Sequence, residues 1–143
     1  MPESIWSYPR PPRVERTGRR ITVAHAGVVV VDTDQGWRVL ETGHPPAYYV
    51  PRAALTDADL VPADERTFCE FKGEATYWDL VVGPVAARAA VWSYEDPFPP
   101  YTMLAGAVAF YPGRIDECRV DGELVRAEES DFYGGWITAD VVT

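Results

Sequence analysis

The sequence predicts one all-β domain, built mainly from antiparallel strands as a small sandwich or an open barrel. Short runs of β-branched and aromatic residues, such as residues 28–32, alternate with turns such as Asp121-Gly122. The thirteen prolines exclude long helices, because proline breaks a helix interior, and an aromatic content of 13% favours pleated surfaces. A chain of 143 residues can build one hydrophobic core, so we expect residues 1–143 to form a single domain.

The chain begins with a proline-rich arm, residues 1–13, which Trp6 and Tyr8 are expected to anchor on the domain. Residues 52–60 are the best candidate for one or two short helical turns, although aspartates weaken the second half. Residues 131–137 join aromatic side chains to two glycines, which indicates a tight bend or a close approach of the backbone. The expected strands cover residues 21–24, 28–32, 37–41, 48–50, 67–71, 75–82, 85–94, 108–111, 115–120 and 124–127.

Charge and composition exclude several classes of partner. The net charge of −9 argues against nucleic acid, whose phosphates need a basic surface, and against an anionic membrane face. No apolar segment approaches the length of a membrane span, and the start of the chain lacks the pattern of a signal peptide. Two cysteines are too few for a disulfide framework. We therefore expect an acidic, cytoplasmic protein with reduced thiols.

Neither metal nor serine chemistry has a matching pattern in the sequence. The soft ligands His25, His44, Cys69 and Cys118 are scattered, whereas zinc requires a set of well-placed ligands. A Gly-x-Ser-x-Gly elbow is absent, and no spacing singles out a pair among the 22 acidic residues. The sequence therefore predicts no metal site and no cofactor.

A central hairpin, residues 69–78, gathers a thiol, an amine, carboxylates and aromatic rings around one glycine. A two-residue turn at Gly73-Glu74 suits a glycine in its first central position. Strand alternation then places Cys69 and Trp78 together on an apolar face, where a cysteine behaves as a small, inert hydrophobe. A thiol mechanism at Cys69 is the alternative.

The other face of this hairpin would carry Glu70, Lys72 and Tyr77 side by side. A lysine in a partly dry pocket binds an anion, or serves as a base or an amine nucleophile. Glu41 ends its strand just before a proline pair and is the expected counter-charge. The alternative is a solvated pair of Glu70 with Lys72, which contributes little to stability.

Several motifs occur in order along the chain, at residues 6–12, 45–51, 69–78, 92–94, 110–111 and 132–136. Together they resemble the small bacterial family catalogued as domain of unknown function 427. The resemblance implies a β-tent fold, similar to methionine-R-sulfoxide reductases and glutathione-dependent formaldehyde-activating enzymes. Many of these relatives hold zinc through Cys-x-x-Cys pairs, which this chain lacks. The family has also been labelled a nucleotidyltransferase, but the chain has neither a glycine-rich phosphate loop nor a paired-aspartate metal motif.

Three hypotheses for function remain. The first is a binding module whose aromatic-lined pocket holds a small organic molecule or a short peptide near Lys72 and Tyr49. The second is an enzyme at the same pocket, with Lys72 or Cys69 as nucleophile or base and Glu41 or Tyr77 as its partner. The third is a structural or homodimeric interaction module. The expected ligand-binding residues are Arg10, Tyr49, Glu70, Tyr77, Trp92, Tyr94 and Trp136, and the expected catalytic residues are Lys72, Glu41 and Cys69.

Overall fold

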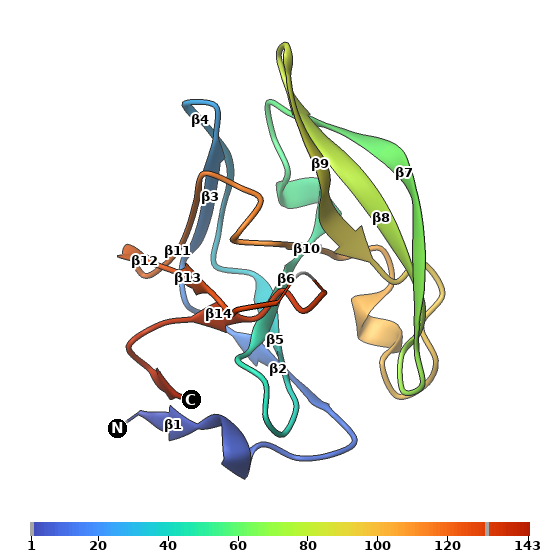
Figure 1. Cartoon of the computed structure of the whole chain (residues 1–143), viewed down its shortest axis with the longest axis vertical. Helices are drawn as coiled ribbons and strands as arrows, with labels where there is room; N and C mark the ends of the chain where they lie inside the picture. The colour runs from blue at the N-terminus through green and yellow to red at the C-terminus, as the bar shows by residue number, and fades with distance from the viewer. Residues whose placement is uncertain (1, 131) are drawn as a thin grey trace.

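Two antiparallel sheets pack against each other in the computed structural model, which describes residues 2–130 and 132–143 (Figure 1). The larger sheet has seven strands, in the order β2 (Arg13–Thr17), β5 (Gly36–Leu40), β6 (Ala47–Val50), β10 (Val108–Phe110), β9 (Val85–Ser93), β8 (Gly73–Val82) and β7 (Asp59–Cys69). The smaller sheet has four, in the order β12 (Glu123–Leu124), β11 (Glu117–Val120), β3 (Ile21–His25) and β4 (Val28–Thr33). The predicted all-β, mainly antiparallel fold is confirmed, as an open sandwich rather than a closed barrel.

Two short strand pairs lie near the ends of the chain. β1 (Glu3–Ser4) pairs in parallel with β15 (Val141–Val142), so the two termini lie close together in Figure 1. β13 (Arg126–Ala127) pairs with β14 (Trp136–Ile137) in antiparallel fashion.

The helical content of the described residues consists of single 3₁₀ turns, which are η1 (Ile5–Ser7), η2 (Arg52–Ala54) and η3 (Thr102–Leu104). The helix expected over residues 52–60 is limited to η2. Asp57 adopts a left-handed φ of 57°, and Asp59 already begins β7. The predicted short helical turn is therefore present, but it ends earlier than its expected bounds.

The main hydrophobic core lies between the two sheets. Its side chains come from alternate strand positions, so Tyr48 and Val50 enter it while Tyr49 faces the opposite side of the larger sheet. Trp136 also lies in this core and is only 1% exposed. Its indole Nε1 donates a hydrogen bond to the carbonyl oxygen of Phe110 at 3.0 Å.

The opposite face of the larger sheet carries a buried aromatic cluster. Paired strand positions across β6, β10, β9 and β8 are Tyr49, Ala109, Trp92 and Tyr77. Because a small alanine lies between large rings in this row, we infer that this face is hollowed rather than flat. The segment that carries η3 lies beside the end of the β7–β8 hairpin (Figure 1). There the amide of Phe98 donates a hydrogen bond to the carbonyl oxygen of Lys72, in the hairpin loop, at 2.9 Å.

The proline-rich arm lies against the domain. Ile5 and Tyr8 form a small buried cluster with Leu40 of β5. Farther along the arm, the carbonyl oxygen of Pro12 accepts a hydrogen bond from the hydroxyl of Tyr101 at 2.7 Å. These contacts place the arm next to the aromatic face of the larger sheet.

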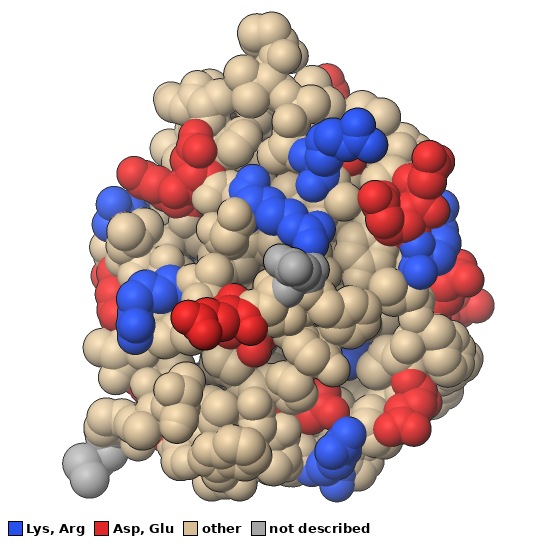
Figure 2. All heavy atoms as spheres, viewed as in Figure 1, with Lys and Arg blue, Asp and Glu red and all other residues tan. Residues whose placement is uncertain are grey.

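Acidic and basic side chains are interspersed on the face shown in Figure 2, without a patch of one sign. Ion pairs account for part of this mixture: Arg20 pairs with Asp32 and Arg52 pairs with Glu95, each at 2.8 Å. Among the residues that the structure describes, no helix is long and apolar enough to cross a membrane.

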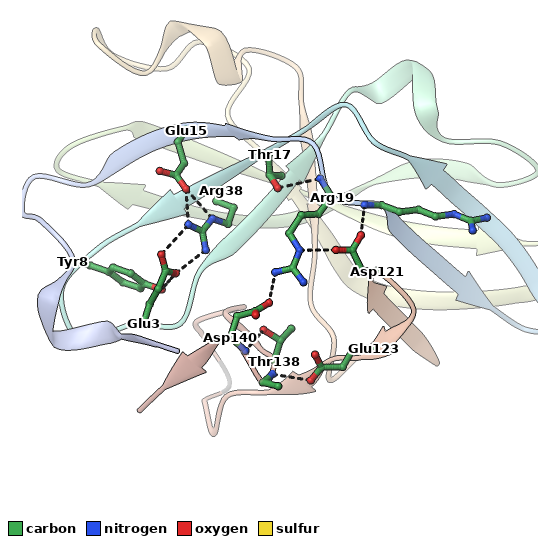
Figure 3. A network of polar contacts seen from close by, with 12 residues as sticks. Glu3, Tyr8, Glu15, Thr17, Arg19, Arg38, Asp121, Glu123, Thr138 and Asp140 are labelled. Atoms are coloured by element: carbon green, nitrogen blue, oxygen red, sulfur yellow. Dashed lines mark hydrogen bonds and ion pairs between the residues drawn. The ribbon is translucent and has the colours of Figure 1, made fainter. Parts of the chain in front are cut away.

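A polar network joins both termini to the sheets (Figure 3). Arg38 of β5 donates hydrogen bonds to Glu3 at 2.9 Å and to Glu15 of β2 at 3.0 Å. Arg19 donates to Asp121 at 2.8 Å and also pairs with Asp140 near the C-terminus.

Candidate functional site

A cavity of about 260 Å³ opens on the aromatic face of the larger sheet. Its walls come from the arm, the β5–β6 connection, β6, the β7–β8 hairpin, β9 and residues 128 and 132–135. The sequence-predicted residues that line it are Arg10, Glu41, Tyr49, Cys69, Glu70, Lys72, Tyr77, Trp92 and Tyr94. Trp136 does not line it, because this side chain enters the core on the other side of the sheet.

The β7–β8 hairpin does not have the two-residue turn expected at Gly73-Glu74. Cys69 pairs with Gly73 and Thr67 pairs with Ala75, so residues 70–72 form a three-residue loop. Gly73 has a φ of 105°, which a glycine tolerates at the residue that follows such a loop.

This register reverses the expected division of faces, because alternate residues point to opposite sides of a strand. Cys69 is half-buried, packs against the aromatic cluster and lines the cavity. Trp78 packs on the inter-sheet side instead, where its Nε1 donates to Ser93 Oγ at 3.0 Å. The prediction that Cys69 shares a face with Trp78 and is separated from Lys72 is therefore wrong.

Lys72 extends from the hairpin loop into the cavity wall and is only 7% exposed. Its Nζ donates to Cys69 Sγ at 3.4 Å and lies 5.5 Å from the ring centroid of Tyr94. Within the described part of the chain, no carboxylate oxygen lies within 4.0 Å of this nitrogen. Glu41 lines the same cavity but forms its ion pair with Arg10, at 3.9 Å. The expected direct pairing of Lys72 with Glu41 is therefore wrong.

Hydrogen bonds hold several of the aromatic side chains around the cavity. Trp92 Nε1 donates to the hydroxyl of Tyr49 at 2.9 Å, and the hydroxyls of Tyr77 and Thr67 lie 2.9 Å apart. Burial raises the pKa of Tyr49 and Tyr94 above the ordinary value, so both phenols are neutral at pH 7. The site thus offers neutral hydroxyls, one amine and one thiol.

Residues 128 and 132–135 line one side of the cavity and were not predicted as part of the site. Phe132 and Tyr133 are about half exposed at the mouth, and the ring centroid of Tyr133 lies 4.5 Å from that of His44. Glu128 accepts a hydrogen bond from the amide of Gly135 at 2.8 Å, which holds the segment in place.

The glycines of this segment were its one signal in the sequence. A Cβ at Gly134 would lie 2.5 Å from the indole of Trp92, and one at Gly135 would lie 2.9 Å from the carbonyl oxygen of Pro45. The close backbone approach expected for residues 131–137 is confirmed at these two positions. Asp131 lies outside the described residues.

No group of three or more His, Cys, Asp or Glu side chains is placed to hold a metal ion within residues 2–130 and 132–143. His44, Glu41, Glu70 and Glu128 line the cavity together with Cys69, but no three of them come together as metal ligands in the described residues.

The fold and the cavity together define a small open β-sandwich with an aromatic-walled pocket. The family described as Domain of unknown function (DUF427) matches residues 13–121, which is most of the chain, and the protein belongs to this family. The matched region includes Lys72 and Cys69, whereas Arg10 and the segment 128–135 lie outside it. A comparison with curated proteins found no match.

Proposed function

We propose that this domain binds a small organic molecule whose carboxylate or carbonyl oxygen meets Lys72 and whose apolar body lies among the rings near Tyr49. The observation that supports the proposal is a buried amine with no carboxylate within 4.0 Å in the described structure. A buried ammonium group without a carboxylate partner is costly, so this position favours an anionic or strongly accepting ligand.

The other charged side chains that line the cavity are exposed or already paired, so Lys72 is the group that would bind an anionic ligand. Arg10 and Glu41 form a partly exposed pair at the mouth, and such pairs contribute little to binding or stability. Glu128 accepts the amide hydrogen bond of its own segment, and Glu70 is exposed on the hairpin loop. Lys72 is therefore the most buried of the charged side chains that line the cavity.

The walls of the cavity suit a flat, apolar group. Its volume of about 260 Å³ is slightly below the roughly 300–1,000 Å³ of pockets for drug-sized ligands. A single aromatic ring with a polar head, or one side chain of a short peptide, matches this size. Trp92 and Tyr94 supply ring surface, and the Tyr94 hydroxyl forms no hydrogen bond to a described residue, so it can orient the polar head.

Benzoate, benzamide and benzylamine share one aromatic ring and differ in the charge of the head group. Titration of the three by ligand-observed NMR therefore separates the contribution of the head group to the affinity from that of the ring. We expect benzoate to bind most tightly and benzylamine least. Lys72→Met should weaken benzoate binding roughly tenfold to a hundredfold, which corresponds to ~1.5–3 kcal/mol for a charge-assisted hydrogen bond.

Arg88→Met is the matched control, because Arg88 is exposed on β9 and does not line the cavity. Its affinity for benzoate should equal that of the unmodified protein. The proposal fails if benzylamine binds as well as benzoate, or if Lys72→Met leaves the affinity for benzoate unchanged.

An enzyme at the same pocket is the second candidate, and one contact favours it. Lys72 Nζ and Cys69 Sγ are in hydrogen-bond contact at 3.4 Å, so an amine and a thiol face the same bound molecule. The partners expected for them are engaged elsewhere, Glu41 with Arg10 and Tyr77 with Thr67. Any chemistry therefore centres on the amine–thiol pair.

A further inference from the structure

The chain uses lysine only once. Its 13 basic Lys and Arg residues include Lys72 as the sole lysine, and all the others are arginine. Arginine binds carboxylates through two parallel hydrogen bonds and is the better residue where only a fixed positive charge is needed. Lysine offers what arginine does not, which is a primary amine that can lose its proton and attack carbon. A sole lysine in the cavity wall therefore suggests a requirement for the amine itself.

Cys69 gives this amine a partner for proton transfer. Its Sγ is in hydrogen-bond contact with Nζ at 3.4 Å, and both side chains line the same cavity. The other thiol, Cys118, is only 2% exposed in the core between the sheets, where burial raises its pKa. Cys118 is therefore unreactive, and Cys69 is the thiol that a bound molecule can meet.

We infer that Lys72 captures the carbonyl carbon of an aldehyde or ketone as an imine, with Cys69 donating the proton that the step requires. This inference rests on the proposed function, because the carbonyl compound must first bind in the cavity. To that binding function the inference adds two things. The ligand is a small carbonyl compound with an aromatic or apolar body, and it forms a covalent bond with Lys72.

The step balances without an oxidant or a reductant. Lys72 first releases the proton of its ammonium group to solvent. The neutral amine then attacks the carbonyl carbon, a C–N bond forms, and the π electron pair moves to oxygen. A proton passes from nitrogen to that oxygen and gives a carbinolamine. The Cys69 thiol then protonates the hydroxyl group, the C–O bond breaks and one water leaves. The products are a protonated imine on Lys72 and a thiolate at Cys69.

The surroundings of Lys72 favour this product. The side chain is 7% exposed and lies beside the ring of Tyr94, so little water can reach the imine carbon and reverse the reaction. The thiolate left at Cys69 also supplies the counter-charge that the protonated imine needs in a buried site.

Benzaldehyde with cyanoborohydride tests the inference, because this reductant converts an imine into a stable secondary amine. Peptide mass mapping of the full chain then locates the adduct. Because Lys72 is the only lysine in the chain, it is the only lysine side chain that can be labelled. We expect Lys72 to be labelled roughly tenfold or more faster than a solvent-exposed lysine, which is a conservative value for general acid–base assistance.

The matched control moves the lysine to the surface. The double variant Lys72→Met with Arg88→Lys places the only lysine on the exposed side of β9 and sets the rate of an unassisted amine. Cys69→Ser tests the thiol: labelling of Lys72 should slow by about tenfold or more, and its pH profile should change, because the acid has been replaced. A purely structural role for Cys69 would leave the pH profile unaltered.

Four results would overturn parts of this account, and each removes a different part. Labelling of Lys72 no faster than that of the surface lysine would exclude capture as an imine, and an unaltered pH profile in Cys69→Ser would exclude proton donation by the thiol. If benzoate binds at Lys72 while benzaldehyde is not trapped, the imine step falls and the binding function stands. If neither compound engages Lys72, the binding function falls as well.

Discussion

At Gly134 the backbone lies directly against the aromatic wall of the cavity. A Cβ there would lie 2.5 Å from the indole of Trp92 and 3.0 Å from the ring of Tyr111. Neither ring is free to move aside, because Trp92 donates a hydrogen bond to Tyr49 and Tyr111 donates one to the carbonyl oxygen of Phe132. A methyl group at this position must therefore displace the segment that covers the cavity.

Gly134→Ala is expected to lower the free energy of unfolding by about 1–3 kcal/mol, as overpacking of a close contact usually does. Gly18→Ala is the control, because a Cβ at Gly18 would meet no atom within 4 Å, and its effect should stay within about 0.5 kcal/mol. Urea denaturation measures both values. Equal free energies of unfolding for the two variants would show that the contact is not tight.

For individual residues, the sequence predicted the types of side chain at the cavity better than their partners. Lys72 and Tyr49 line the same cavity as predicted, although Tyr49 lies on β6 and Lys72 in the loop between β7 and β8. The partner of Glu41 could not be predicted, because Arg10 belongs to the arm before β2. Only tertiary packing places that arm beside the end of β5.

Among the elements, the β7–β8 hairpin shows why the face of a residue is hard to predict. A single glycine is compatible with either a two-residue or a three-residue loop. The three-residue loop allows the carbonyl oxygen of Lys72 to accept a hydrogen bond from Phe98, a contact from a distant segment. Because a shift by an odd number of residues moves every side chain to the other face, this choice brings Cys69 to Lys72.

The segment after Pro51 shows a weak helix preference overridden by tertiary contacts. The amide of Thr56 donates to the carbonyl oxygen of Val30 in β4 at 2.8 Å, which draws the backbone away from a helical path. The next residue, Asp57, has a φ of 57° and ends any helical course. Propensity over a few residues cannot compete with such contacts.

For the whole molecule, the polar network in Figure 3 makes stability depend on pH. Hydrogen bonds from Arg38 are the main reason that the pKa of Glu3 lies below its ordinary value of 4.5. A carboxyl group with a lowered pKa in the folded state stabilises the fold above its unfolded pKa, and this contribution is lost as pH falls through the folded pKa. The ion pair of Glu3 in β1 with Arg38 in β5 should therefore weaken as the pH falls below about 4.5.

Glu3→Gln is expected to lower the free energy of unfolding at pH 7 by about 1 kcal/mol or less, because the ion pair is partly exposed. The difference from the unmodified protein should vanish at strongly acidic pH, where Glu3 is protonated in both states. Glu65→Gln serves as the control, since Glu65 is exposed on β7 and has no ion pair among the described residues. A difference for Glu3→Gln that persists unchanged in acid would contradict the assignment.

The fold class could be predicted because β-branched runs and turn residues alternate along the whole chain. The strand order could not, since β10 lies between β9, the strand before it, and β6, which comes from a distant part of the sequence. Such pairings depend on packing of both faces rather than on local pattern. The possible homodimer stays a prediction, which sedimentation at increasing protein concentration would test.

Isotope labelling tests directly whether a bound molecule contacts Lys72. Growth with ¹³Cε-lysine labels a single side chain, because the chain has only one lysine. We expect benzoate to shift the ¹³Cε resonance in a saturable way, and benzylamine to leave it unchanged at the same concentrations. A resonance that benzoate does not move, or that both compounds move equally, would contradict a ligand site at Lys72.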